Sequence, residues 1–422
     1  MRWLLVGVLL ASRVEAGDWT LYRFEGRDYV TLDNVAQFYG LPAPGPLPAG
    51  AGTLAPAPSP AATAPAPTPP QTTVPASGAT PPPAPSAPLA PATPTAAKVT
   101  PPAASPSPVT TAPLTAGSGE GEFPGVSLDP VGGHLVRLQN DKLELAVVLN
   151  SREAEINGVK QWLAFPARVQ DGKVMISRLD LSKVIEPRLR PERVQGLRPV
   201  TTVVLDPGHG GHDKGAASRY GYEKDFALDV ALAARTQLEK MGVKVVMTRS
   251  ADIFIPLQQR AAVANGIKDS IFVSIHFNAA TSNPSARGFE IYSLAPRGAP
   301  ATNDGNFTIR NLREEPGNVV DTLSTALAGT VFHSLLGNVP LPDRGLKHAR
   351  FAVLRLCTQP AVLVECGFVS NSADSALIGT PAWRNKVAEA IVTGVESYKD
   401  LAEQGQKPRH MADYRRVSGV AP

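Results

Sequence analysis

The stretch VVLDPGHGG, residues 203–211, decides the fold of this chain. A short apolar, β-branched run ends at Asp206-Pro207-Gly208, and a histidine follows between glycines. This pattern predicts a buried strand of a parallel α/β sheet, whose carboxyl end opens toward the crevice where ligands bind. Glycines lack Cβ atoms, so backbone and ligand can approach each other closely there. His209 is therefore predicted to lie at the ligand-binding edge of a sheet.

Three further segments place ligand-type side chains in the same way. Glu223 opens a helical pattern that continues to Met241, and strand-like runs end at His276 and at Glu365. Two imidazoles and a carboxylate with one open position are the ligand set of a catalytic zinc ion, and a further carboxylate can act as general base. The combination predicts zinc-assisted hydrolysis of an amide or ester.

The chain resembles the zinc-dependent N-acetylmuramoyl-L-alanine amidases of bacterial cell walls, amidase type 3. The resemblance covers roughly residues 199 to 400 and rests on motifs in matching order, namely LDPGHGGHDKGA (205–216), YEKD (222–225), SIHFNA (274–279), RGLKHARFAVLR (344–355) and VLVECGFVSN (362–371). It implies one Zn²⁺ held by His209, Glu223 and His276, with Glu365 as catalytic acid/base. It also implies cleavage of the amide between the lactyl group of N-acetylmuramic acid and the L-alanine that starts the stem peptide.

Other polar residues near these motifs are weaker candidates. Asp206 is a candidate acceptor for the second ring N–H of a metal-bound histidine. Asn278 either orients its loop or touches substrate, and Arg344 is a candidate partner for a stem-peptide carboxylate. His212 competes with His209 as a ligand. The remaining histidines have no motif around them: His134, His333, His348 and His410.

Strands and helices alternate through the catalytic region, residues 199–400. This alternation predicts a single three-layer α/β/α domain with a mostly parallel sheet and right-handed crossovers. The predicted strands are 243–248, 270–275 and 287–292, and the predicted helices are 223–241, 256–264, 318–336 and 381–398. The polar stretch 295–317 is predicted either to shape the substrate groove or gate the zinc, or to be a tolerated surface insertion.

The amino terminus predicts export. Residues 1–16 have a charged start, an apolar run and a small residue at a plausible cleavage point, as in a secretory signal peptide. An uncleaved anchor is the alternative. No other segment looks long and apolar enough to span a membrane. The mature protein is expected in the periplasm or cell envelope, or secreted.

A small β-rich module precedes the catalytic region. Residues 25–33 and 171–180 echo each other, each as a turn, a strand and a helix start. We therefore expect 17–40 and 127–195 to pack as one split domain, resembling the non-catalytic N-terminal domain of copper amine oxidases, with no copper chemistry implied. Residues 41–126 are proline-rich and form the predicted extended linker, and 401–422 form a predicted flexible basic tail.

Charge and cysteine content narrow the partners. The formal charge of +4 favours adsorption to an anionic wall polymer, and no motif resembles a nucleic-acid-binding one. Peptidoglycan is the expected substrate, the chain is expected to be a monomer, and the need for a protein activator stays open. Cys357 and Cys366 are expected to be buried free thiols. A zinc peptidase cutting within the stem peptide and a catalytically silent wall-binding protein remain alternative functions.

Overall fold

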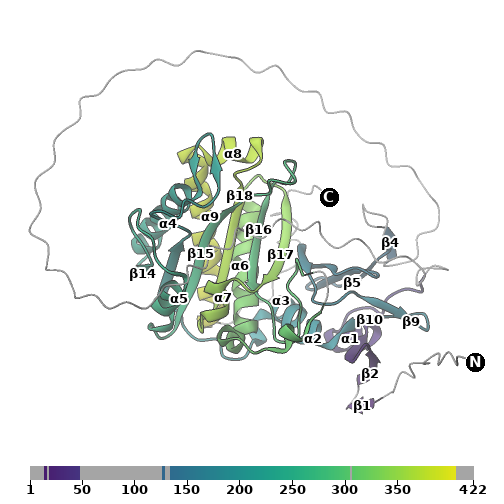
Figure 1. Ribbon diagram of the computed structural model, residues 1–422. Coiled ribbons are helices and arrows are strands. Elements are labelled where there is room, and N and C mark those ends of the chain that lie inside the picture. Colours follow the sequence, from purple (N-terminus) through teal and green to yellow (C-terminus); the bar gives the residue numbers. More distant parts are fainter. Residues whose placement is uncertain (1–13, 17–18, 48–125, 129–133, 305–306, 405–422) are drawn as a thin grey trace, which may run out of the picture. The chain divides into compact units, whose positions relative to one another are not determined.

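A central sheet carries the chemistry-bearing residues of this chain (Figure 1). The computed structural model describes residues 14–16, 19–47, 126–128, 134–304 and 307–404. The sheet has the strand order β14-β11-β15-β18-β16-β17-β8-β7-β6-β5-β4. Its catalytic half consists of β14 (Lys244–Met247), β11 (Thr202–Pro207), β15 (Ser270–Asn278), β18 (Ala361–Phe368), β16 (Phe289–Leu294) and β17 (Asp343–Ala349).

Helices cover both faces of this half, as the alternating pattern predicts. The main apolar core lies between the sheet and α4 (Glu223–Lys240), α6 (Asp321–Asn338) and α9 (Pro381–Gln404). A second apolar cluster packs α5 (Leu257–Asn265) and α7 (Ala352–Leu356) against the other face. Shorter elements are β12 (Ala217–Ser218), β13 (Gly221–Tyr222), α8 (Ser372–Ile378) and the 3₁₀ turns Ile309–Leu312 and Pro316–Val320. The predicted three-layer α/β/α fold is confirmed.

The sheet is mixed at one side. Strands β14, β11, β15 and β18 run parallel, whereas β16 runs antiparallel to β18 and β17 runs parallel to β16. The strand expected at 287–292 is therefore antiparallel to its neighbour β18. Residues 279–288 join β15 to β16 without a helix, and a parallel neighbour needs a longer crossover.

The direction of β16 also decides where the stretch 295–317 begins. Leu294 ends β16 beside the amino end of β18, because β16 is antiparallel to it. The stretch that follows stays at this opposite edge, where Arg350 donates to the carbonyl of Ala299 at 2.6 Å and Arg355 pairs with Glu315 at 3.4 Å. Asn303 of this stretch hydrogen-bonds to Tyr292, whose hydroxyl donates to Glu290 at 2.7 Å, so the stretch also reaches the residue that lies opposite Glu365.

Both cysteines are buried and free, as expected. Residues 352–356 form α7, which precedes Cys357, whereas Cys366 lies within β18.

In the described part of the chain, one helical segment, Pro316–Asn338, is long and apolar enough to cross a membrane by its length and composition. We had expected no such segment beyond the amino terminus. Within its 18-residue apolar window, 67% of the residues are buried. The helix packs against α9 and the sheet, as the core helix of a globular domain does.

The amino-terminal segment pairs with a segment far along the chain. A smaller sheet has the order β1-β2-β3-β10-β9 and contains β1 (Val14–Ala16), β2 (Trp19–Phe24), β3 (Arg27–Thr31), β9 (Arg168–Gln170) and β10 (Lys173–Ser177). Strand β3 pairs antiparallel with β10, with Val30 opposite Ile176. The two echoed segments are thus neighbouring strands, and Thr31 and Ser177 cap the helices that follow each of them, α1 (Leu32–Tyr39) and α2 (Arg178–Asp180).

The remaining module strands extend the central sheet beyond β17. They are β8 (Val159–Trp162), β7 (Glu153–Ile156), β6 (Glu144–Val148), β5 (His134–Gln139) and β4 (Val126–Leu128). Strand β8 lies parallel to β17, with Gln161 opposite Leu346. A helical stretch then leads from α2 through the π-helical turn Leu181–Ile185, α3 (Glu186–Leu189) and the 3₁₀ turn Pro191–Arg193 to β11. Most of the predicted signal peptide, linker and tail, at 1–13, 48–125 and 405–422, lies outside the described residues.

Candidate active site

The four predicted chemical residues meet at the carboxyl edge of β11, β15 and β18. His209 follows β11 by two residues, and Glu223 is the first residue of α4. His276 and Glu365 lie directly opposite each other on the parallel strands β15 and β18. Because parallel strands end at the same edge, residues separated by more than 150 positions come together here.

Three of these side chains form a group able to hold a metal ion. Glu223 Oε1 lies 3.1 Å from His209 Nε2 and 2.9 Å from His276 Nδ1. One ligand atom from each of the three residues lies within 4.8 Å of the other two. Two imidazoles and a carboxylate at this separation fit a zinc ion with one open position.

Backbone amides fix the Glu223 carboxylate. Phe277 N donates to Oε1 at 3.1 Å, and Ala216 N donates to Oε2 at 2.9 Å. Burial raises the pKa of Glu223, but the contacts with His209 and His276 outweigh burial and leave this pKa well below its usual range. Glu223 is therefore an anion in the site.

The charge of Glu223 acts on the neighbouring imidazole. Burial lowers the pKa of His209, yet Asp213 and Glu223 more than compensate and raise it to about 10. A divalent cation at this point would satisfy the same carboxylates that favour the imidazolium.

Two glycines leave the space that the ligand side chains occupy. A Cβ at Gly208 would lie 2.4 Å from the ring of His276, and a Cβ at Gly215 would lie 2.6 Å from Glu223 Oε2. His209 itself has φ of +58°, a left-handed conformation that is uncommon for a residue with a side chain. The backbone is thus shaped around the imidazole and carboxylate groups.

The carboxylate beside His209 is that of Asp213 and not that of Asp206, contrary to the sequence-based expectation. Asp213 Oδ1 lies 2.9 Å from His209 Nδ1, the ring nitrogen that does not face Glu223. The carboxylate of Asp206 is engaged elsewhere, because it accepts from Thr248, Arg260 and Ser274. Arg260 connects Asp206 to the backbone carbonyl of His209.

Two buried arginines hold the loop that follows β11, and neither was singled out from the sequence. Arg249 donates to the carbonyls of Pro207 at 3.0 Å and Gly208 at 2.7 Å. Arg260 donates to the carbonyl of His209 at 2.6 Å and to Asp206 at 2.9 Å. Both side chains are 2% exposed. Charged side chains are seldom buried without partners, so these bonds fix the loop that presents His209.

Glu365 differs from the other carboxylates of the site. It is 6% exposed, and no described residue hydrogen-bonds to its Oε2 atom. Burial raises the pKa of Glu365 well above its ordinary value, and the negative charges of Glu223 and Glu290 add to the effect. A carboxyl group whose pKa is raised in this way suits proton transfer.

Glu290, missed in the sequence, lies directly opposite Glu365 on β16. It is fully buried and accepts hydrogen bonds from Asn278 at 2.6 Å, from Tyr292 at 2.7 Å, from Arg344 at 2.9 Å and from Lys347. Asn278 and Arg344 thus meet at Glu290, and Asn278 Oδ1 also accepts from the backbone of Ala279. The available signal was a carboxylate within the otherwise apolar strand-like run FEIYSL, which needs partners when buried.

Irregular pairing occurs on both sides of Glu365 and Glu290. Between His276 and Asn278 the register of β15 with β18 shifts, and Gly367 in β18 has φ of +139°. Between Phe289 and Ile291 the register of β16 with β17 shifts, and Gly345 in β17 has φ of +84°. Such bulges redirect side chains and are common next to active sites.

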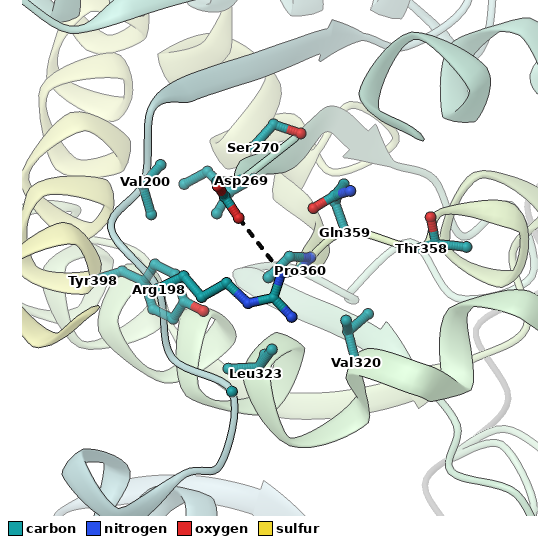
Figure 2. A pocket seen from close by; sticks show the side chains of 12 residues that line it. Arg198, Val200, Asp269, Ser270, Val320, Leu323, Thr358, Gln359, Pro360 and Tyr398 are labelled. Atoms are coloured by element: carbon teal, nitrogen blue, oxygen red, sulfur yellow. Dashed lines mark ion pairs between the residues drawn. The ribbon is translucent and has the colours of Figure 1, made fainter. Parts of the chain in front are cut away.

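Other candidates lie outside this group. His212 stacks on Phe254 at 4.3 Å between ring centroids and is not part of the metal-binding group. A cavity of about 120 Å³ lies at the opposite edge, where Val200, Ser270 and Pro360 are at or just before the amino ends of the strands. Figure 2 shows Arg198 pointing across this cavity to Asp269, at 3.6 Å. The cavity is separate from the histidine cluster.

Comparison with known proteins finds the same family for the catalytic region. Residues 203–397 match the family model described as N-acetylmuramoyl-L-alanine amidase. The amidase AmiC of Neisseria meningitidis is 39% identical over 224 residues, covering 48% of this chain and 53% of that protein. AmiC of Escherichia coli is 33% identical over 58% of this chain and 67% of its own length, and AmiA of Escherichia coli is 36% identical over 46% and 75%. This chain therefore spans about half the length of the Neisseria relative.

The chain is also similar in sequence to a solved structure. The crystal structure of an N-acetylmuramoyl-L-alanine amidase from Clostridium difficile is 33% identical, covers 49% of this chain and 100% of its own, and superposes with a TM-score of 0.40.

Proposed function

This chain belongs to the N-acetylmuramoyl-L-alanine amidase family, and from that premise we propose that it hydrolyses the amide between N-acetylmuramic acid and L-alanine in peptidoglycan. The observation that carries the proposal is the convergence of His209, Glu223 and His276, with Glu365 directly opposite His276. A catalytically silent wall-binding protein would have no need for this arrangement.

We propose that the three clustered residues hold Zn²⁺. When bound there, zinc lowers the pKa of a coordinated water to about 7 and polarises the substrate carbonyl. The donor set, and the two glycines that leave room for it, support this assignment. Asp213 then orients the imidazole of His209 and keeps it basic.

Glu365 is the proposed acid/base. Its buried carboxylate accepts the proton of the attacking water and delivers a proton to the nitrogen of the leaving L-alanine. Glu223 and Glu290 raise the pKa of Glu365, and a divalent cation held by the neighbouring ligands would oppose their effect. The Glu365 carboxylate would then be ionised before the reaction and able to take up a proton during it.

Peptidoglycan lies outside the cytoplasm, so we also propose that the chain acts after export, in the periplasm or envelope. The apolar start of the sequence supports this assignment.

The test is digestion of purified peptidoglycan by the zinc-loaded full chain, with mass spectrometry of the products. We expect release of stem peptides with a free L-alanine amine, loss of release with a chelator, and recovery when zinc is returned. Glu365→Gln should lower the rate by about 10²- to 10⁴-fold, because it removes the proton-transfer group while keeping the side-chain shape.

Each contrary result identifies a different error. Cleavage within the stem peptide would mean that the chain is a zinc peptidase and not an amidase. Full activity of Glu365→Gln would remove the proposed acid/base. No release by the isolated zinc-loaded chain would contradict independent activity, and release on adding envelope extract would then indicate a protein activator.

A further inference from the structure

Arg344 extends from β17 toward the strand that carries Glu365. We propose that Arg344, held by Glu290 and Phe368, is a subsite that binds a carboxylate of the stem peptide beside the reacting bond. The proposal rests on the proposed function, because it names the substrate feature that the same site recognises.

The position of Arg344 follows from three contacts. Its Nε donates to Glu290 Oε2 at 2.9 Å, and its Cζ atom lies 4.9 Å from the centroid of the Phe368 ring. Phe368 belongs to β18 and follows Glu365 by three residues. Strand β16 separates β17 from β18, so the Arg344 side chain extends across β16 toward β18, the strand that carries Glu365.

The free donors of Arg344 suit a carboxylate. Glu290 engages Nε, and no described residue accepts a hydrogen bond from either Nη group. The side chain is 26% exposed, whereas Glu290 is fully buried. Two parallel N–H groups of a guanidinium match the two oxygens of a carboxylate, and a lysine cannot reproduce this planar fork.

The local charge balance also favours an anion. Glu290 contributes one negative charge, while Arg344 and Lys347 each contribute a positive one. Lys347 is 2% exposed, so of these two cations Arg344 is the one that a ligand from solvent can meet. A carboxylate on the substrate would complete the balance.

The backbone of Arg344 is held by the β-rich module. Trp162 Nε1 donates to the Arg344 carbonyl at 3.2 Å. A Cβ at Gly345 would lie 2.9 Å from the side chain of Lys160. Neighbouring β8 therefore fixes the bulge that aims the guanidinium, which reduces the entropy that binding would otherwise cost.

The test uses two ligands whose γ-carboxyl group is blocked as an amide and that differ at the α-carboxyl group alone, N-acetylmuramyl-L-alanyl-D-glutamic acid γ-amide and the corresponding α,γ-diamide. The first has a carboxylate where the second has a carboxamide. Calorimetry on the zinc-loaded full chain carrying Glu365→Gln measures binding, and turnover of both compounds is measured with the chain that keeps Glu365.

We expect tighter binding of the carboxylate compound. Arg344→Gln should weaken that binding roughly 10- to 100-fold and leave the carboxamide compound nearly unchanged, because a charge-assisted pair is lost for one ligand only. Arg344→Lys should lose most of the preference although it keeps the charge. Arg355→Gln is the matched control, since Arg355 also pairs with a buried glutamate, Glu315, but at the opposite edge.

A positioning role for Glu290 has its own readout. Glu290→Gln should narrow the preference between the two compounds, which loss of folded protein alone would not do. Equal binding of the two ligands, or a preference that survives in Arg344→Gln, overturns the subsite. Cleavage of both compounds without preference would support the amidase reaction and contradict the subsite. Preferential binding of the carboxylate compound without cleavage would support the subsite and contradict the proposed reaction.

Discussion

A carboxylate next to a metal-bound imidazole fixes the ring and raises its basicity. Asp213 occupies that position beside His209, and the sequence alone pointed to Asp206 instead. The difference arises from the backbone, because His209 has φ of +58° and the chain turns back to bring Asp213 to 2.9 Å from Nδ1. A side chain four residues along a loop is hard to place before that turn is known.

Asp213→Ala should weaken zinc binding by about 10- to 100-fold, since an outer partner of a ligand histidine is lost. The measurement is a competition titration of the full chain with a zinc-sensitive dye. Asp252→Ala is the control, because Asp252 accepts from Gly211 and Lys224 at the same edge but is not paired with either ligand histidine. Equal zinc affinity in the two variants would contradict the role of Asp213.

His348 makes a prediction about stability that does not involve the metal. Burial lowers its pKa from 6.5 to about 4, its Nδ1 lies 3.1 Å from Ser293 Oγ, and it sits on β17 near the opposite sheet edge. Above pH 6.5 the imidazole is neutral in both folded and unfolded chains. As pH falls from 6.5 toward 4, the unfolded chain takes up a proton that the folded chain excludes, so stability is lost.

Between pH 7 and pH 4.5 this residue should lower the free energy of unfolding by about 2 kcal/mol. His348→Gln should make the dependence of unfolding on pH shallower by that amount, whatever it does to stability at pH 7. Urea unfolding at both values measures the difference. Parallel pH dependence in the two proteins would mean that His348 is protonated in the folded chain.

At the level of strands and helices, sequence patterns predict the position of a functional residue best when that residue directly follows, or ends, a recognisable strand. The runs ending at His209, His276 and Glu365 are each a strand followed by a chemical group, so their meeting at one edge follows from parallel pairing. The direction of β16 did not follow from its own residues. It depends on the short connection 279–288, which has no helix to carry the chain back across the sheet.

That one reversal changes two other assignments. It starts 295–317 beside the amino end of β18, and it places Glu290 opposite Glu365. Arg344 is brought to Glu290 because β17 then lies beside β16. The network around Glu290 thus depends on long-range pairing, and the sequence shows only a charged residue within an apolar strand.

At the scale of the whole molecule, the chain uses distant segments to build shared structures. Strand β8 pairs with β17, so the hydrogen-bonded sheet passes from the β-rich module to the catalytic region. Strand β3 similarly pairs with β10. The proline-rich stretch between β3 and β10 therefore separates, in sequence, two segments that are neighbours in the folded chain.

We predict that a chain cut within 48–125 stays associated under native conditions. Leu32 and Val35 of α1 are fully buried in a core shared with β5, β6 and β10, and Tyr39 donates to Glu186 of α3. A protease site inserted in the stretch permits the cut, and size-exclusion chromatography then measures whether the fragments elute together. They should separate only in denaturant.

Val35→Asp is the comparison for this experiment, because an unpaired carboxylate in that core costs several kcal/mol and should release the amino-terminal fragment. Release from the unsubstituted chain at neutral pH would mean that β3 and α1 do not hold to the module on their own. In that case the two segments could not be treated as one split domain. If the unsubstituted chain keeps the amino-terminal fragment and Val35→Asp releases it, the shared apolar core is what holds the fragment. Neither the cut nor the substitution removes a residue of the β3–β10 pairing.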